Sequence, residues 1–253
     1  MTLEAYFKKQ PGNAFFKQLG QHLRTNKLAK LVEIILVFLV AILFIMAFLS
    51  NKISDLLYNQ AILWFANIIM LTLVFSGIKL RGEGLSHFGL SFKKITRKIG
   101  FKTFYQSILV FILATAGFII GSIIMANITG IPESSDMSNY DYLKDNIGLL
   151  LLTLIGVYIV ASFGEEVIYR AFLINRISEL GLSGKAGKII VVIISAIIFG
   201  LAHYSWGPMG IVQTTFMGLA LGFSYIYLNK RIWVLILAHA YMDTILMLQL
   251  YFS

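Results

Sequence analysis

The sequence predicts an all-α protein, a polytopic transmembrane helical bundle with about seven or eight helices. Two observations support this prediction. Hydrophobic residues make up 58% of the 253 positions and charged residues only 13%, whereas about a quarter of the residues in a soluble domain are charged. The apolar residues also gather in runs close to the ~20 residues that a helix needs to cross the hydrocarbon core of a bilayer. We therefore expect an integral, multi-pass protein of the cell membrane, with a single membrane domain over residues 1–253.

Seven such runs follow one another along the chain, and short polar segments separate them. They fall at residues 31–50, 56–77, 103–127, 148–175, 187–204, 209–228 and 232–251. The fourth run is unusually long. No polar segment between the runs is large enough to form a soluble domain of its own.

Charges between the runs indicate the orientation of the chain. Residues 1–30, 79–102, 176–188 and 229–231 are rich in Lys and Arg, whereas residues 128–147 are mainly acidic. Positive charge marks the cytoplasmic side, which predicts a cytoplasmic N-terminus and an external C-terminus. The leader over 1–30 mixes aromatic and basic residues like an amphipathic helix on anionic lipid. Because the basic residues are scattered over four segments, the net charge of +9 reflects topology, and we expect no nucleic-acid partner.

Cysteine is absent from the sequence. The protein therefore has no disulfide, no thiolate nucleophile and no cysteine-ligated metal. Any catalysis must use oxygen, carboxylate or imidazole groups.

Ionisable residues at bilayer depth are concentrated in the region 148–251, which we expect to contain the catalytic helices. They are Glu165, Glu166, Arg170, His203, His239 and Asp243. Each such group costs roughly 2.5–3.5 kcal/mol on insertion scales, so a cluster of them indicates a functional site.

The depth of these residues follows from a rise of about 1.5 Å per helical residue. Counted from the nearest basic residue, Glu165 lies roughly 16 Å, His239 roughly 12 Å and His203 roughly 22 Å into the bilayer. The three helices can therefore present carboxylate and imidazole groups to one cavity. Two of the three residues lie nearer the basic end, which favours a cavity that faces the cytoplasm.

Helical spacing relates the charges within each helix. Glu166 and Arg170 are four residues apart and share a face, which predicts a neutralised structural ion pair. Glu165 points about 100° away and is left to face the cavity. Asp243 lies four residues after His239, where it could orient the imidazole or accept a hydrogen bond from substrate or water.

Three motifs on separate helices carry a resemblance to a known family. Glu-Glu-x-x-x-Arg (165–170), Phe-x-x-x-His (199–203) and His-x-x-x-Asn/Asp (239–243) resemble, in this order, the motifs of the CPBP intramembrane peptidases. That family includes the CAAX prenyl endopeptidases and bacterial homologues linked to bacteriocin immunity and peptide maturation. The resemblance implies a hydrolase that acts on a peptide or lipidated protein inside the membrane.

The same resemblance implies roles for individual residues. Glu165 and His203 would activate a water, and His239 and Asp243 would stabilise the oxyanion or hold the water. Glu166 and Arg170 would secure the site, and Phe199, one turn before His203, would shape the cavity wall. Asp243 departs from the Asn of the eukaryotic CAAX enzymes, and an ionised Asp cannot donate to an oxyanion. It could act through His239, in a protonated form, or as a metal ligand.

The metal requirement stays open at this stage. Glu165, His203, His239 and Asp243 offer the nitrogen and oxygen ligands that zinc accepts, and members of the family are described both as metallopeptidases and as metal-free enzymes. His-Glu-x-x-His is absent. We expect no obligatory cofactor.

Two other functions compete with the peptidase interpretation. Buried Glu, Asp and His residues also form proton relays in ion-coupled transporters. The charge that we expect to be buried here is concentrated in the second half of the chain, whereas such transporters have symmetric broken helices in both halves. A catalytically silent membrane scaffold of the same fold is the second alternative. The sequence defines neither the natural substrate nor the oligomeric state.

Overall fold

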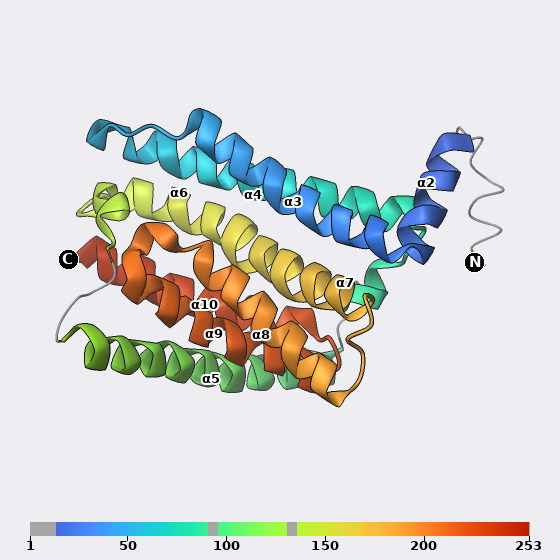
Figure 1. The fold of residues 1–253 in the computed structure, drawn as a ribbon. Coiled ribbons are helices and arrows are strands. Elements are labelled where there is room, and N and C mark those ends of the chain that lie inside the picture. Colours follow the sequence, from blue (N-terminus) through green and yellow to red (C-terminus); the bar gives the residue numbers. More distant parts are fainter. Residues whose placement is uncertain (1–13, 91–95, 131–135, 253) are drawn as a thin grey trace.

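The computed structural model describes residues 14–90, 96–130 and 136–252, and every element among them is a helix (Figure 1). The predicted all-α bundle is confirmed. Residues 1–13 of the expected leader and part of the expected acidic segment, 131–135, lie outside the described residues. The leader continues as helix α2 (Ala14–Thr25), on which Phe15 and Phe16 are exposed, as an interfacial helix requires.

The long helices follow the predicted runs closely. They are α3 (Lys27–Phe48), α4 (Leu56–Leu80), α5 (Arg97–Thr129), α6 (Ile147–Val157), α8 (Lys185–Leu201), α9 (Gly207–Tyr227) and α10 (Ile232–Phe252). Helix α6 continues without a break as the π-helix η4 (Tyr158–Ile174) and the short α7 (Asn175–Ser178). Four short 3₁₀ turns lie in the connections: η1 (Ile53–Asp55), η2 (Leu85–Phe88), η3 (Ser138–Leu143) and η5 (Tyr204–Trp206).

Six of the described helices are long and apolar enough to cross a membrane. The predicted long fourth run is one of them, with 32 residues over Ile147–Ser178, although α5 is equally long with 33. The run expected at 187–204 corresponds to α8, which has only 17 residues. Helix α8 nevertheless runs along the bundle beside α9, and the two termini lie at opposite ends of the bundle (Figure 1). That arrangement agrees with seven crossings.

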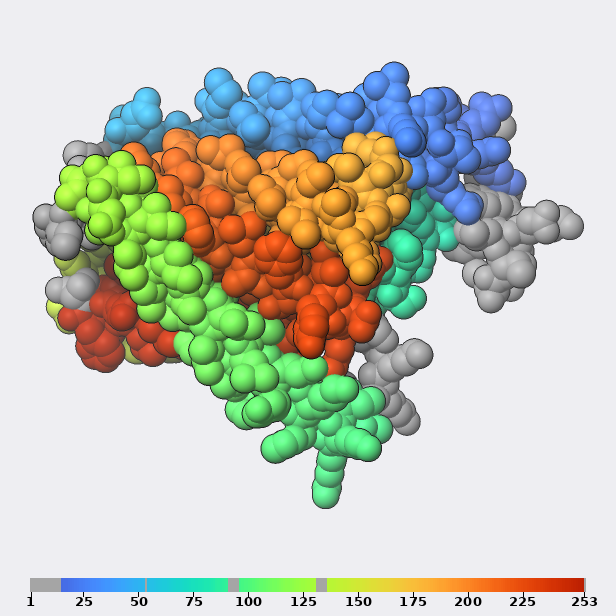
Figure 2. All heavy atoms as spheres, turned by 60° about the horizontal axis from the view of Figure 1, so that its bottom comes forward, coloured from blue at the N-terminus to red at the C-terminus, as the bar shows by residue number. Residues whose placement is uncertain are grey.

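Close backbone contact fixes α9 against α5 and α8. A Cβ atom at Gly121 of α5 would lie 2.8 Å from the Cα of Gln213, and one at Gly200 of α8 would lie 2.7 Å from the carbonyl oxygen of Ile211. Small residues at such positions let helices approach closely in a membrane, where packing drives association. Figure 2 shows α5, in green, lying diagonally across one face of the bundle, over the later helices.

The two ends of the bundle differ in charge. The end near the N-terminus carries the basic segments that precede α5, α8 and α10, and the opposite end carries η1, η3, η5 and the C-terminus (Figure 1). We call them the basic end and the acidic end. The described connections of the acidic end over 49–55, 136–146 and 202–206 contain four Asp residues and two Lys residues.

Two of the basic residues expected to mark the cytoplasmic surface are instead fully buried. Arg81 pairs with Glu33 of α3 and, at 3.3 Å, with Glu179, while Arg176 pairs with Glu179 at 2.7 Å and with Glu83 at 3.1 Å. We call these five residues the basic-end ion cluster. It joins α3, the end of α4 and α7, so these arginines hold helices together in addition to contributing charge to that end.

Candidate active site

A cavity of about 1100 Å³ brings the four predicted catalytic residues together. Glu165 of η4, His203 beside η5, and His239 and Asp243 of α10 all line it. Much of the remaining wall comes from α3 and α4 and is apolar, with Phe38, Leu63 and Met70 among its residues. The expected convergence of three motifs on one cavity is therefore present.

The wall of this cavity lies toward the acidic end of the bundle, and the expectation of a cytoplasm-facing site stays a prediction. Its wall includes Asn139 of η3, Ser205 of η5 and Gln249 near the end of α10, all at the acidic end. No described residue of 79–102, 175–188 or 226–235 lines it. Depth counted separately along each helix could not tell which end of the bundle is closed by packing.

A π-helix carries the first motif. Sequence patterns predicted one regular span, whereas the chain widens from Tyr158 to Ile174, a stretch that contains Glu165, Glu166 and Arg170. π-Helical turns are rare and are frequent at functional sites. Glu166 and Arg170 are buried here, while Glu165 is partly exposed to the cavity.

His239 lies among three carboxylates. Its Nδ1 is 2.9 Å from Oε1 of Glu166, a hydrogen bond, and its Nε2 lies 3.8 Å from Oε2 of Glu165 and 3.7 Å from Oδ1 of Asp243. Glu166 therefore holds the imidazole more closely than Asp243, for which the sequence analysis left open an orienting role or a hydrogen bond to substrate or water. Its second nitrogen points between the two carboxylates that line the cavity.

The predicted ion pair between Glu166 and Arg170 is present. Nη1 of Arg170 lies 3.0 Å from the same Oε1 of Glu166, and both side chains are almost completely buried. The guanidinium also lies over the ring of Phe199, 4.2 Å from its centroid, a geometry that favours cation–π attraction. Phe199 in turn contacts the rings of His203 and His239, at centroid distances of 4.8 Å and 6.2 Å. This buried ring connects all three motifs.

His203 lies just beyond the end of α8, where the chain turns into η5. Its Nδ1 is 2.9 Å from the carbonyl oxygen of Phe199. If Nδ1 donates this hydrogen bond, Nε2 is unprotonated in the neutral ring and can accept a proton. Trp206 packs edge-on against the imidazole at 4.7 Å, which restricts the orientation of the ring.

Two further residues of the site had no signal in the sequence analysis. The hydroxyl of Ser162 donates a 2.6 Å hydrogen bond to Oδ2 of Asp243. Tyr140 of η3 lines the cavity. Burial raises the pKa of its phenol, and the nearby Tyr142, Asp243 and Glu165 raise it further. The phenol therefore stays protonated and available as a donor. The spacing of Ser162, three residues before Glu165, could have suggested its position, but Tyr140 lies in a segment that we interpreted only as topology.

The described side chains do not form a ready-made metal site. No group of three or more His, Asp or Glu residues among them is arranged to hold a metal ion. Nε2 of His239 lies 3.7 Å and 3.8 Å from the flanking carboxylate oxygens, but Oε1 of Glu166 is occupied by Nδ1 of His239 and by Arg170. We derive no chemical step through a metal.

Comparison with known proteins supports the resemblance noted from the motifs. Residues 147–245 match the family model described as type II CAAX prenyl endopeptidase, Rce1-like. The matched segment contains all three motifs, so the recognition of a CPBP-type peptidase domain is confirmed. A search of curated proteins and a search of solved structures each found no match. The family match indicates a protease-type fold with a protein substrate in a membrane environment.

Proposed function

From this Rce1-like domain we propose that the protein is an intramembrane endopeptidase, which hydrolyses a peptide bond with a water activated by Glu165 and His203. The observation that carries the proposal is the convergence of Glu165, His203, His239 and Asp243 on one cavity. General acid–base catalysis needs a base within reach of the attacking water, and electrostatic catalysis needs donors near the developing oxyanion. These four side chains supply both kinds of group.

In the proposed reaction, Glu165 takes a proton from water while Nε2 of His203 holds the same water. The hydroxide adds to the carbonyl carbon and forms a tetrahedral oxyanion. His239, with Nδ1–H donated to Glu166, presents Nε2–H to that oxyanion when the ring is doubly protonated. The intermediate then collapses, the C–N bond breaks, and the proton held by Glu165 passes to the leaving amine.

Asp243 and Tyr140 complete this arrangement. The Ser162 hydroxyl occupies Oδ2 of Asp243, so Oδ1 is left to accept a hydrogen bond from His239, water or the substrate backbone. The protonated phenol of Tyr140 can donate to the carbonyl oxygen or to a carboxylate. We propose that an obligatory metal is not part of this reaction.

Cleavage of a quenched fluorescent peptide tests the proposal. Purified protein in detergent is given a prenylated CAAX peptide and its unprenylated form, with and without a strong chelator. We expect turnover in the unmodified protein that persists with chelator and is lost in Glu165→Gln, His203→Ala and His239→Ala. Ser183→Ala, in the exposed loop before α8, is the matched control and keeps full turnover.

Each contrary result has a definite meaning. Full turnover in Glu165→Gln would reject the proposed base. Loss of turnover with chelator, restored by zinc, would make the enzyme metal-dependent. Absence of turnover with both peptides in every protein would leave two explanations, a different natural substrate or the silent scaffold.

A further inference from the structure

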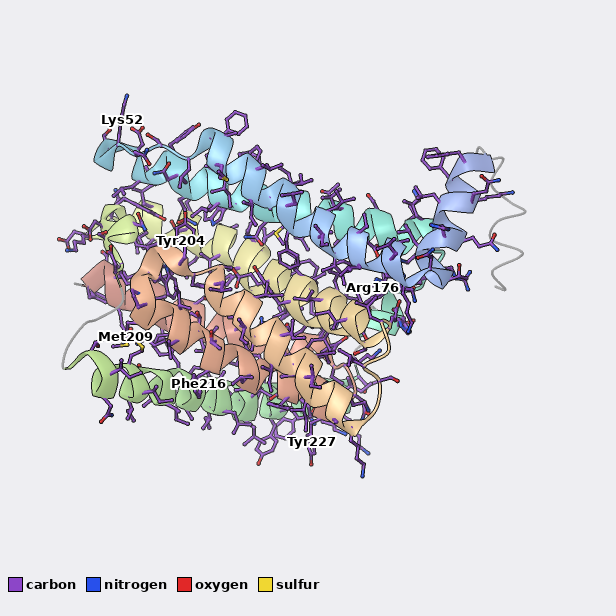
Figure 3. The ribbon with its side chains drawn as sticks, in the orientation of Figure 1. Lys52, Arg176, Tyr204, Met209, Phe216 and Tyr227 are labelled. Carbon is purple, nitrogen blue, oxygen red and sulfur yellow. The ribbon has the colours of Figure 1, made fainter. Side chains whose placement is uncertain are left out.

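The cavity wall reaches the acidic end of the bundle, and on α3 it stops at Ile34, next to Glu33 of the basic-end ion cluster. Its wall at the acidic end includes Asn139, Ser205, Trp206 and Gln249. Ser205 and the neighbouring cavity residue Ala202 are exposed, so the cavity meets the surface here. Figure 3 shows Tyr204, another wall residue, near this end, and Arg176 of the basic-end ion cluster near the other.

The basic end is closed by charge and packing. Arg81 and Arg176 have no exposed surface, and they join Glu33, Glu83 and Glu179 in a continuous set of ion pairs. Below the catalytic residues, Phe172, Leu173 and Ile174 are also fully or almost fully buried. Removing one partner of a buried ion pair costs about 3–5 kcal/mol, so opening a path for substrate through this end would be unfavourable.

The distribution of charge identifies the side on which the open end lies. Lys79, Lys98, Lys102, Lys185, Lys188 and Arg231 belong to the basic end, whereas the described connections of the acidic end hold four Asp residues against two Lys residues. Lys and Arg mark the cytoplasmic side of membrane proteins. The closed end is then cytoplasmic and the open end faces outward.

We propose that the active-site cavity is entered from the extracytoplasmic side, and that its substrate is a mainly apolar segment of an exported peptide. The second part rests on the proposed peptidase function, while the first does not. Phe38, Ile42, Leu63, Met70 and Leu246 give the cavity a largely apolar wall, which favours apolar side chains on both sides of the scissile bond. The acidic residues near the mouth disfavour a segment with acidic flanks.

Single-cysteine labelling tests the direction of entry, because the natural chain has no cysteine. Ala202→Cys and Asn139→Cys place a thiol at the cavity mouth. Ser54→Cys marks the exposed surface of the acidic end, and Ser183→Cys marks that of the basic end. A charged, membrane-impermeant maleimide is added to intact cells and to inside-out vesicles, and the thermal midpoint of each variant is compared with that of the cysteine-free protein.

We expect Ala202→Cys and Asn139→Cys to react in intact cells together with Ser54→Cys, while Ser183→Cys reacts only in inside-out vesicles. Two outcomes would overturn the proposal. If both mouth variants react only in inside-out vesicles, as Ser183→Cys does, the cavity opens to the basic end. If Ser54→Cys labels only in inside-out vesicles, the whole bundle has the opposite orientation. Using two mouth variants keeps the test decisive if one of them fails to fold.

A competition experiment tests the substrate class. A Leu- and Ala-rich peptide with a charged, impermeant tag is added to intact cells during labelling, and a hydrophilic peptide of the same length and tag is the control. We expect the apolar peptide to slow the labelling of Ala202→Cys several-fold and to leave Ser54→Cys unchanged. Equal labelling rates with both peptides would reject the apolar substrate. Labelling needs no turnover. If the mouth variants label in intact cells while no peptide is cleaved, the entry route is supported and only the peptidase function fails.

Discussion

A single carboxylate oxygen of Glu166 holds two cationic or potentially cationic side chains. Oε1 lies 2.9 Å from Nδ1 of His239 and 3.0 Å from Nη1 of Arg170, in a fully buried position. Arg170 is thereby neutralised, and the imidazole is oriented with Nε2 toward the cavity. The residue therefore links the stability of the fold to the geometry of the site.

Replacing Glu166 with Gln should destabilise the protein by about 3–5 kcal/mol, because the buried guanidinium of Arg170 loses the one ion-pair partner that it has among the described residues. The thermal midpoint of the purified variant in detergent measures this change. Glu165→Gln is the matched control, since Glu165 lies in the cavity wall and its nearest ion-pair atom is 3.8 Å away. Similar midpoints for the Glu166→Gln variant and the unmodified protein would contradict this role of Glu166.

Ser162→Ala should reduce turnover and leave the fold intact. The hydroxyl donates a 2.6 Å hydrogen bond to Asp243, and hydrogen bonds to charged groups contribute about 1.5–3 kcal/mol. A loss of about 1.4 kcal/mol of transition-state stabilisation corresponds to a tenfold lower kcat/KM. Ser195→Ala removes a 2.7 Å hydrogen bond to the carbonyl oxygen of Tyr169, and Ser195 itself does not line the cavity. This control variant should keep a higher turnover. Equal kcat/KM values for the two variants would argue against a positioning role for Ser162.

The three motifs predicted which residues belong to the site more accurately than they predicted which of these residues contact one another. The cost of burying charge singled out Glu165, His203, His239 and Asp243, and all four line one cavity. The partner of His239 could not be predicted, because spacing within α10 favoured Asp243 whereas the closer carboxylate comes from another helix. Contacts between helices depend on their relative rotation, which the sequence of one helix does not contain.

Among the elements, helix α5 contacts both α9, which holds the helix of the second motif, and α10, which carries the third motif. Helix α9 packs on α5 through Gly117 and Gly121 and on α8, which carries Phe199. Hydrophobic runs predicted these helices, but not their pairing. The π-helical widening of η4 was also missed, because a run of apolar residues has the appropriate length for either helix type.

Gly121→Ala should lower the stability by about 1–3 kcal/mol, the usual cost of overpacking. The added Cβ would lie 2.8 Å from the Cα of Gln213 and 3.0 Å from the carbonyl oxygen of Val212, so α5 and α9 would have to separate. Gly148→Ala in α6 is the control, since its Cβ would meet only the Asn146 side chain at 3.5 Å. Thermal unfolding of both variants in the same detergent gives the comparison. A midpoint for Gly121→Ala at or above that of the control would refute the close contact.

For the whole molecule, the closure of the basic end by buried ion pairs is the main feature that the sequence analysis did not predict. Basic residues were treated as solvent-facing markers of the cytoplasm, yet Arg81 and Arg176 have no exposed surface. Hydrophobicity predicted the six described candidate spans in their order, and the remaining predicted run, 187–204, corresponds to the 17-residue helix α8. Which end closes depends on contacts among α3, α4 and α7, and these contacts involve residues far apart in the sequence.

Stability should depend on pH through the basic-end ion cluster. Burial acts to raise the pKa of Glu179, but Arg176 and Lys30 outweigh it and hold the pKa below its ordinary value. A depressed pKa in the folded state contributes stability above the unfolded pKa of about 4.3, and this contribution disappears as the pH falls through the folded value. Glu179→Gln should therefore have a lower thermal midpoint than the unmodified protein at pH 7, and the difference should shrink below about pH 4. A difference that is independent of pH from 7 to 3.5 would contradict this role.

The measurement that tests the central claim most directly is the turnover of Glu165→Gln, set beside its thermal midpoint. The substitution keeps the size of the side chain and removes its ability to accept a proton from water. We predict a fall in kcat of at least about 10²-fold, the lower range for loss of a general base, with a midpoint close to that of the unmodified protein. Undiminished kcat at an equal midpoint would show that Glu165 is not the base and would contradict the proposed mechanism.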